Sequence, residues 1–126
     1  MLLSEESYRK IEKELAKFPA TKKRSAAIAA LTIAQDEKGW LSPEVMQEIA
    51  DYLGVPAVAI EEVATFYSMF NTRPVGKYKI AVCCNLPCEM TGSDQTAQYL
   101  KEKLNIGFGE TTPDGLFTLV ESECMG

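Results

Sequence analysis

The chain contains no histidine, so it lacks the side chain that most often serves as a general base near neutral pH and as a metal ligand. Any metal in this protein must therefore be bound by thiolates, carboxylates or backbone groups. Basic residues are also scarce, with 13 against 18 acidic residues and a net charge of −5. This balance argues against nucleic acid as a partner, because a phosphate backbone is bound by clustered lysine and arginine.

Long apolar runs are missing as well. No segment approaches the roughly 20 apolar residues that a membrane helix needs. The start, MLLSEESYRK, turns acidic by Glu5, which is not typical of a signal peptide. The sequence therefore predicts no direct membrane insertion and a cytoplasmic location. Disulfides are rare in that compartment, so the four cysteines are expected to be metal ligands, redox groups or core residues.

The first half of the chain has the periodicity of helices. Ser4 and Ser42 each precede acidic residues and an apolar stripe, which is typical of a helix start. Ser25 is expected to open another helix, and a further one begins near Pro56. That last helix carries apolar residues on more than one face, so we expect it to be the most buried. Residues 1–72 are thus predicted to form an N-terminal four-helix bundle.

In the second half of the chain the spacing of apolar residues changes from that of helices alone to a mixture of strands and a helix. KYKIAVCC alternates as a strand does, TGSDQTAQYLKEKLN is helical, and LFTLVE is again strand-like. This order predicts a sheet covered by a helix in residues 73–126, and an α+β class for the whole chain. GFGETT has only the first two glycines of a dinucleotide fingerprint, and it stands between a helix and a strand in the wrong order. We therefore expect neither a nucleotide-binding nor a catalytic site in this chain.

Three of the four cysteines stand close together in KIAVCCNLPC. Cys83 ends the predicted strand, and Cys88 lies in the loop that leads into the next helix. Two thiolates at this spacing can reach one iron, and the free amides of such a loop can offset the negative charge of an iron–sulfur cluster. The spacing is also compatible with zinc ligands, with Cys83 or Cys84 as a buried structural thiol, or with thiol redox exchange. The gap from Cys84 to Cys88 is not the two-residue gap of a thioredoxin-type redox motif.

Three stretches carry a resemblance to a known family: EEVATFYSMF, RPVGKYKIAVCCNLPC and FTLVESECMG. They resemble the E-type subunit of the bacterial NADH-quinone oxidoreductases (respiratory complex I), to which mitochondrial flavoprotein 2 is similar. The resemblance covers nearly the whole chain. It implies an N-terminal helical bundle followed by a thioredoxin-like ferredoxin domain, which holds a [2Fe–2S] cluster through a C-x4-C pair and a later C-x3-C pair.

By that resemblance the cluster ligands are Cys83, Cys88 and Cys124, whereas Cys84 is not a ligand. The fourth ligand would stand at position 128, beyond Gly126, so the resemblance implies that the ferredoxin domain is cut short here.

The resemblance also implies a function and a partner. The chain is expected to be an electron-transfer subunit of an NADH-oxidising module, on the cytoplasmic side of the inner membrane. The partner subunit would bind FMN and NADH, and this chain would exchange electrons with that flavin. Equivalent subunits of NAD-linked hydrogenases and formate dehydrogenases are an alternative. A different class of function is a helical docking module with a structural zinc site at Cys83, Cys88 and Cys124.

Overall fold

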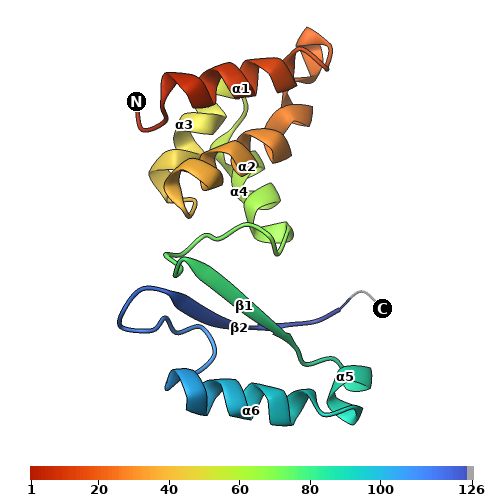
Figure 1. The fold of residues 1–126 in the computed structure, drawn as a ribbon. Coiled ribbons are helices and arrows are strands. Elements are labelled where there is room, and N and C mark those ends of the chain that lie inside the picture. The colour runs from red at the N-terminus through yellow and green to blue at the C-terminus, as the bar shows by residue number, and fades with distance from the viewer. Residues whose placement is uncertain (125–126) are drawn as a thin grey trace. The chain divides into compact units, whose positions relative to one another are not determined.

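The computed structural model describes residues 1–124, which divide into two compact units between Pro74 and Val75. The first unit is helical (Figure 1). Its elements are α1 (Glu5–Leu15), the 3-10 helix η1 (Ala20–Ala26), α2 (Ala27–Lys38), α3 (Pro43–Leu53) and α4 (Ala57–Phe66). The prediction of four α-helices in this half is confirmed.

Serine caps fix two of the helix starts. The Ser4 hydroxyl accepts a hydrogen bond from the Ser7 amide, and the Ser42 hydroxyl accepts one from the Val45 amide, each at 3.2 Å. The prediction that Ser25 opens a helix is wrong. Ser25 lies inside η1, which leads directly into α2, and the Ala27 amide is already bonded to the carbonyl of the preceding turn. No side-chain cap is needed where one helix continues into the next.

The core of the helical unit is built from one stripe of each helix. Its largest fully buried side chains are Ile11, Leu31, Leu41, Ile49, Leu53 and Ile60. The prediction that α4 is the most buried helix is wrong, because α3 buries five residues and α4 only three. Ile60 and Ala64 face the core one turn apart, whereas Val58 and Phe66 lie on the opposite side and are exposed.

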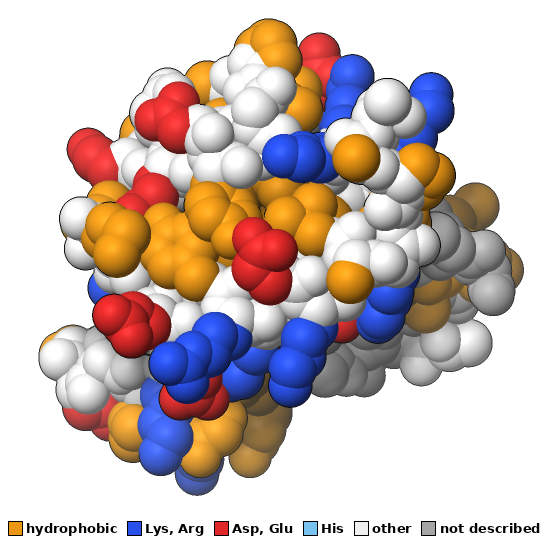
Figure 2. Space-filling view, turned by 90° about the horizontal axis from the view of Figure 1, so that it is seen from above, with side chains coloured by type: hydrophobic (Ala, Val, Ile, Leu, Met, Phe, Trp, Pro, Cys, Tyr) orange, Lys and Arg blue, Asp and Glu red, His pale blue; other side chains and the backbone are white. Residues whose placement is uncertain are grey.

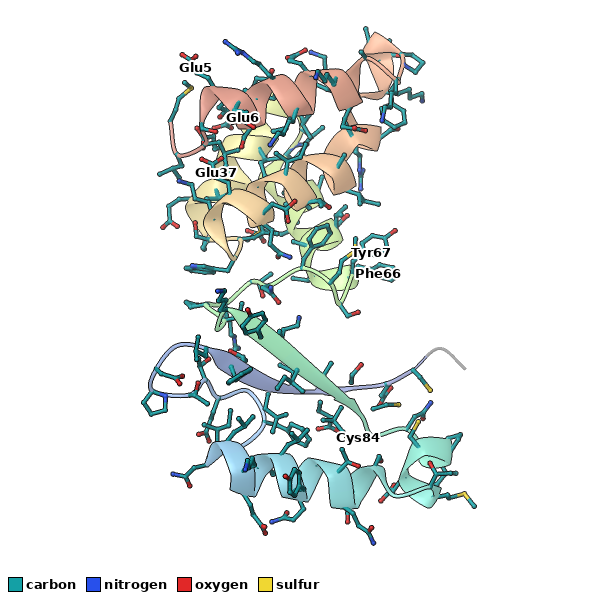
Figure 3. The ribbon with its side chains drawn as sticks, in the orientation of Figure 1. Glu5, Glu6, Glu37, Phe66, Tyr67 and Cys84 are labelled. Atoms are coloured by element: carbon teal, nitrogen blue, oxygen red, sulfur yellow. The ribbon has the colours of Figure 1, made fainter. Side chains whose placement is uncertain are left out.

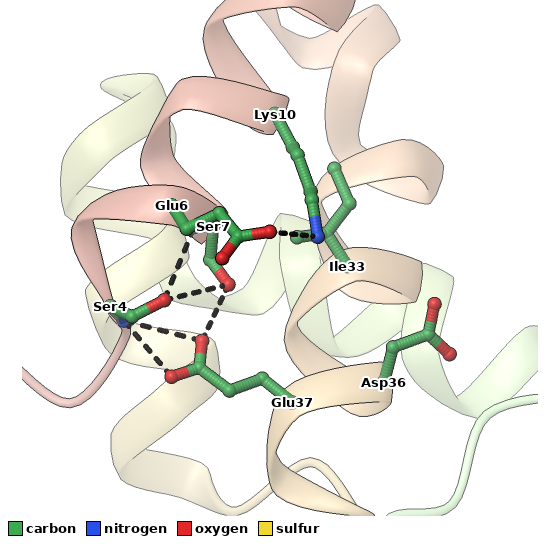
Figure 4. Close-up of a pocket in the computed structure, with 7 residues that line it drawn as sticks. All are labelled: Ser4, Glu6, Ser7, Lys10, Ile33, Asp36 and Glu37. Carbon is green, nitrogen blue, oxygen red and sulfur yellow. Dashed lines mark hydrogen bonds and ion pairs between the residues drawn. The ribbon is translucent and has the colours of Figure 1, made fainter.

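A carboxylate joins the start of α1 to the end of α2 (Figure 4). Glu37 accepts hydrogen bonds from the Ser4 amide at 3.0 Å and from the Ser7 hydroxyl at 2.5 Å. The bond from Ser7, followed by that from Ser4, holds the pKa of the Glu37 carboxyl below its ordinary value. The Lys10 ammonium nearby pairs with Glu6 at 2.9 Å. Glu37 therefore satisfies a free amide at the α1 N-terminus, which α1 itself cannot do.

The second unit is a strand–helix–strand arrangement. It comprises β1 (Tyr78–Cys83), α5 (Leu86–Met90), α6 (Ser93–Leu104) and β2 (Phe117–Ser122), as Figure 1 shows. β1 and β2 pair in parallel, with Tyr78 opposite Phe117 and Cys83 opposite Ser122. A small apolar core joins this sheet to α6 and the segment that follows it; its buried members are Val82, Ala97, Ile106 and Leu119. The predicted mixture of helices and strands is confirmed.

Not all apolar side chains are buried. Figure 2 shows one face of the helical unit, where hydrophobic side chains gather in a band between acidic and basic ones. At the end of α4, Phe66 is 79% exposed, and Tyr67 and Met69 are exposed beside it. None of the helices within residues 1–124 is both long and apolar enough to cross a membrane.

Candidate metal centre

The parallel pairing of β1 and β2 brings two distant cysteines to one edge of the sheet. Cys83 is the last residue of β1 and lies opposite Ser122, the last residue of β2. Cys124 follows two residues later. Because both strands run in the same direction, their carboxyl ends meet at the same edge. Residues that are far apart in the sequence are thus placed at one site by the register of the sheet.

Cys88 reaches the same place from a short helix rather than from a loop. The sequence places it in a loop, but residues Leu86–Met90 form α5. Asn85 is the N-cap of this helix, and its side-chain oxygen accepts a hydrogen bond from the Leu86 amide at 3.1 Å. Pro87 stands in the first turn, where its missing N–H leaves no helical bond unmade. An asparagine followed by proline two residues later is a helix-start signal that could have identified α5 from the sequence.

The three thiols converge. The Sγ atoms of Cys83, Cys88 and Cys124 all lie within 4.8 Å of one another. Cys83 and Cys88 are half-buried, and Cys124 is exposed. A hydrogen bond with Cys83, followed by burial, raises the pKa of the Cys88 thiol to about 11. At neutral pH this thiol is protonated in the metal-free protein, so binding of a metal must displace the proton.

A neighbouring amide supports the third sulfur. The Asn85 Nδ2 group donates a hydrogen bond to Cys124 Sγ at 3.5 Å, while the same side chain caps α5 through its oxygen. Asn85 therefore links the Cys124 sulfur to the helix that carries Cys88. A hydrogen-bond donor beside a metal-binding sulfur offsets part of the negative charge of the thiolate and fixes its orientation.

Cys84, labelled in Figure 3, does not belong to the group of three thiols, although it is adjacent to Cys83 in the sequence. Its Sγ contacts the Val82 carbonyl oxygen at 3.5 Å, and its side chain lines a separate pocket together with Glu89 and Glu121. Burial, and then the charge of Glu121, raise the pKa of this thiol. Successive residues at the end of a strand point to opposite faces, which is the physical reason for the separation.

The residue types and the surrounding space suit an iron–sulfur cluster. Cys83 and Cys88 line an open groove of about 400 Å³ between β1 and α6, so there is room beside the thiols for an inorganic core. Cysteine thiolates are the usual ligands of such clusters. Within residues 1–124, no carboxylate joins the group of three thiols. Cys83, Cys88 and Cys124 could therefore supply three of the ligands that a [2Fe–2S] cluster requires.

Comparison with known proteins agrees with this site. The model of the thioredoxin-like [2Fe–2S] ferredoxin family matches residues 11–126. The chain is 41% identical to NADH-quinone oxidoreductase subunit 2 of Thermus thermophilus over 116 residues, which are 92% of this chain and 64% of that protein. It is 45% identical to an NADH-quinone oxidoreductase subunit of the E type from Rhizobium meliloti, over 92% of this chain and 68% of the relative.

A eukaryotic protein is similar over almost the same region. Identity to the mitochondrial NADH dehydrogenase [ubiquinone] flavoprotein 2 of Dictyostelium discoideum is 42%, over 98% of this chain and 50% of that protein. The chain thus spans between half and about two thirds of the length of these three relatives. The family match extends from α1 through both strands and all four cysteines. On this evidence the chain belongs to the family of thioredoxin-like [2Fe–2S] ferredoxins that includes the E-type subunit of NADH-quinone oxidoreductase.

Proposed function

We propose that this chain is the [2Fe–2S] electron-transfer subunit of the NADH-oxidising module of an NADH-quinone oxidoreductase. The observation that carries the proposal is the convergence of Cys83, Cys88 and Cys124, in a chain whose relatives are named as subunits of that oxidoreductase. Electrons would be exchanged with the flavin of a partner subunit that binds FMN and NADH. The chain would lie peripherally on the cytoplasmic side of the inner membrane, as part of the complex.

The three cysteines and Asn85 would have different roles in the site. Cys83 and Cys88 would hold one iron, because β1 and α5 place their thiols side by side, and Cys124 would bind the other. A [2Fe–2S] cluster accepts and releases one electron at a time, which suits a partner of a two-electron flavin. Asn85 would stabilise the reduced state, because its N–H group donates toward the Cys124 sulfur, on which negative charge increases.

Electron paramagnetic resonance of the dithionite-reduced protein tests the ligands. In the assembled, full-length subunit, Cys83→Ser and Cys88→Ser should abolish the normal cluster signal. Cys84→Ser is the matched control and should leave the signal nearly intact, because Cys84 lines a different pocket. A lost signal in Cys84→Ser with a retained signal in Cys83→Ser would contradict the assignment and favour the pair of Cys84 and Cys88.

The helical region, residues 1–72, is the proposed docking domain for the flavin-bearing partner, and residues 73–126 the cluster domain. Large apolar side chains that remain exposed after folding support this division, since aromatic residues are typical anchors of interfaces. Phe66 and Tyr67 are exposed at the end of α4 (Figure 3), and Met69 is exposed two residues after Tyr67. Two other aromatic residues of the helical region are less accessible, since Trp40 is half-buried and Phe70 is buried in the helical core.

A charge substitution at the most exposed aromatic tests the docking proposal. Phe66→Asp in the full chain should reduce capture of the FMN- and NADH-binding subunit by at least about tenfold, since a hot-spot residue contributes about 2 kcal/mol or more. Tyr99→Asp is the matched control, because Tyr99 is an exposed aromatic on α6 of the other unit. Equal loss of capture in the two variants, or no loss in Phe66→Asp, would rule out α4 as the main contact.

A further inference from the structure

We propose that a groove on the helical unit binds an acidic amphipathic helix of a protein partner. Two hollows make up this groove, called the α1 groove below, and Tyr52 of α3 lines both of them. The first, of about 370 Å³, is also lined by Tyr8 and Arg9 of α1. The second, of about 460 Å³, is also lined by Leu15 and Lys23. The proposal does not rest on the electron-transfer function, because every residue of the groove belongs to the helical unit.

Aromatic side chains form the apolar part of the α1 groove. The rings of Tyr8 and Tyr52 pack together with their centroids 4.8 Å apart, and both side chains are half-buried. The Tyr52 hydroxyl donates a hydrogen bond to the Glu12 carboxylate, so its polar atom already has a partner. Phe18 lines the second hollow and remains 37% exposed. Aromatic carbon that stays accessible in a hollow after folding is typical of the anchor positions of protein interfaces.

The charge around the α1 groove selects the kind of partner. Residues 9–24 contain seven of the 13 basic residues of the chain and only two of its 18 acidic ones. Arg9 and Lys23 line one hollow each, and neither takes part in an ion pair within residues 1–124. Of the carboxylates in the groove, Glu12 accepts the tyrosine hydrogen bond, and Glu5 lies in the first turn of α1, where the helix N-terminus stabilises it. The unpaired charge of the groove is therefore positive, which an acidic segment complements.

The length and shape of the α1 groove favour a helix as the occupant. α1 has 11 residues and is therefore about 16 Å long. The first hollow lies beside Glu5, at the start of α1, and the second extends past Leu15, at its end. A partner helix of about three turns covers that length, and two apolar residues on one face of it, about two turns apart, can each enter a hollow. A flat bilayer surface would leave both hollows empty.

Fluorescence anisotropy of a labelled synthetic peptide tests the proposal on the 126-residue chain. The probe is an amphipathic helix of about four turns with leucine on one face and glutamate on the other. It should bind saturably, with one peptide per chain, and added salt should weaken the binding because salt screens exposed charges. The same peptide with lysine in place of glutamate is the control and should not bind. Absence of binding by the acidic peptide, or equal binding of the two peptides, would overturn the proposal.

Charge-reversal variants locate the binding surface. The double variant Arg9→Glu/Lys23→Glu should weaken binding of the acidic peptide at least about tenfold, because two attractive contacts become repulsive. Lys38→Glu/Lys103→Glu is the matched control, since it changes the net charge equally at two exposed residues outside the groove. The control should weaken binding far less. Equal weakening in the two double variants would show that only the net charge matters, and would refute the groove as the site.

A pair of phenylalanine variants tests the apolar contact. Phe18→Ser should weaken binding of the peptide by about tenfold, because an aromatic anchor is lost from the second hollow. Phe66→Ser, which removes the exposed phenylalanine at the end of α4, is the control and should leave binding unchanged. Loss of binding in Phe66→Ser with normal binding in Phe18→Ser would move the contact to α4 and refute the α1 groove.

Two further measurements separate this inference from other readings. If the chain fails to bind the acidic peptide but captures the FMN- and NADH-binding subunit normally, only the α1 groove is refuted. If it binds the peptide but does not capture that subunit, the groove is supported and the proposed docking role fails. Vesicles that contain phosphatidylglycerol test a membrane as the occupant. Sedimentation of the chain with them that Arg9→Glu/Lys23→Glu abolishes, without peptide binding, would overturn the proposal in favour of a lipid surface.

Discussion

Leu119 lies at the centre of the smaller core, and its truncation should destabilise the second unit alone. The side chain is completely buried in β2, where it packs with Val82, Ala97 and Ile106. Leu119→Ala removes about three carbon atoms from a site that other elements cannot easily fill, and such changes cost about 2–5 kcal/mol.

This loss is large relative to the free energy of unfolding of such a small unit. A unit of about 50 residues is expected to have a free energy of unfolding of about 3–8 kcal/mol. Leu119→Ala should therefore remove between about a quarter of that free energy and all of it. With a urea dependence of about 1 kcal/mol per molar, the unfolding midpoint of this unit should fall by about 2 M or more.

Two probes report on the two units separately. The single tryptophan, Trp40, lies in the helical unit, and all four cysteines lie in the other. Pulsed alkylation of the three half-buried thiols, Cys83, Cys84 and Cys88, at increasing urea follows the second unit, and Trp40 fluorescence follows the first. Leu119→Ala should shift the alkylation transition and leave the fluorescence transition in place. Leu31→Ala, which truncates a fully buried leucine of the helical core, is the matched control and should do the reverse.

A shift of both transitions by the same amount in Leu119→Ala would refute this reasoning, since it would show that the two units unfold as one.

Three further outcomes are expected. In Gly76→Ala the new Cβ would stand 2.9 Å from the Leu116 carbonyl carbon, a backbone atom that cannot move aside. The free energy of unfolding of the second unit, measured in the alkylation assay, should therefore fall by about 1–3 kcal/mol. An unchanged unfolding midpoint would contradict this close packing. The folded-state pKa of Glu37 is lowered, so its stabilising effect is present above its ordinary pKa of 4.5 and is lost as the pH falls through the lower folded value. Glu37→Gln should therefore lower the melting temperature at pH 7 and flatten its decline below about pH 4.5 in circular dichroism melts, and curves of the same shape for both proteins would exclude this role. Asn85→Ala should lower the reduction potential of a cluster held by these thiols, because the contact to Cys124 that stabilises the reduced state is lost, and an unaltered potential in a redox titration would show that the hydrogen bond is unimportant.

Local patterns in the sequence predict helices and strands well where a short stretch, such as a capping residue, determines how the helix or strand begins. Ser4 and Ser42 cap the helices that they were expected to start, because each hydroxyl accepts a hydrogen bond from a free amide in the first turn. The alternation in KYKIAVCC likewise gives β1. Ser25 fails as a cap because a 3-10 helix already precedes α2, and that depends on the path of the chain after Pro19.

Burial and the composition of the site depend on partners that a local pattern does not contain. The apolar residues of α4 predict burial on several faces, but only the side of Ile60 meets other helices, and Phe66 is left exposed. In the same way, spacing alone joins Cys83 to Cys88 but says nothing of Cys124. The third thiol reaches the site because β2 pairs with β1 in one register, and before the structure only the family resemblance indicated this.

Because the three thiols come together only when β2 pairs with β1, the site cannot form until β2 and Cys124 have been synthesised. Cys88 is made 36 residues and Cys83 41 residues before Cys124, which at about 5–20 residues per second is a delay of about 2–8 s. During that interval β1 cannot pair with β2, and the thiols of Cys83 and Cys88 are present without that of Cys124. A metal or cluster delivered during translation would meet an incomplete set of ligands. Correct loading of this site is therefore expected to follow translation of β2, and the supply of metal has to be timed to the folded chain.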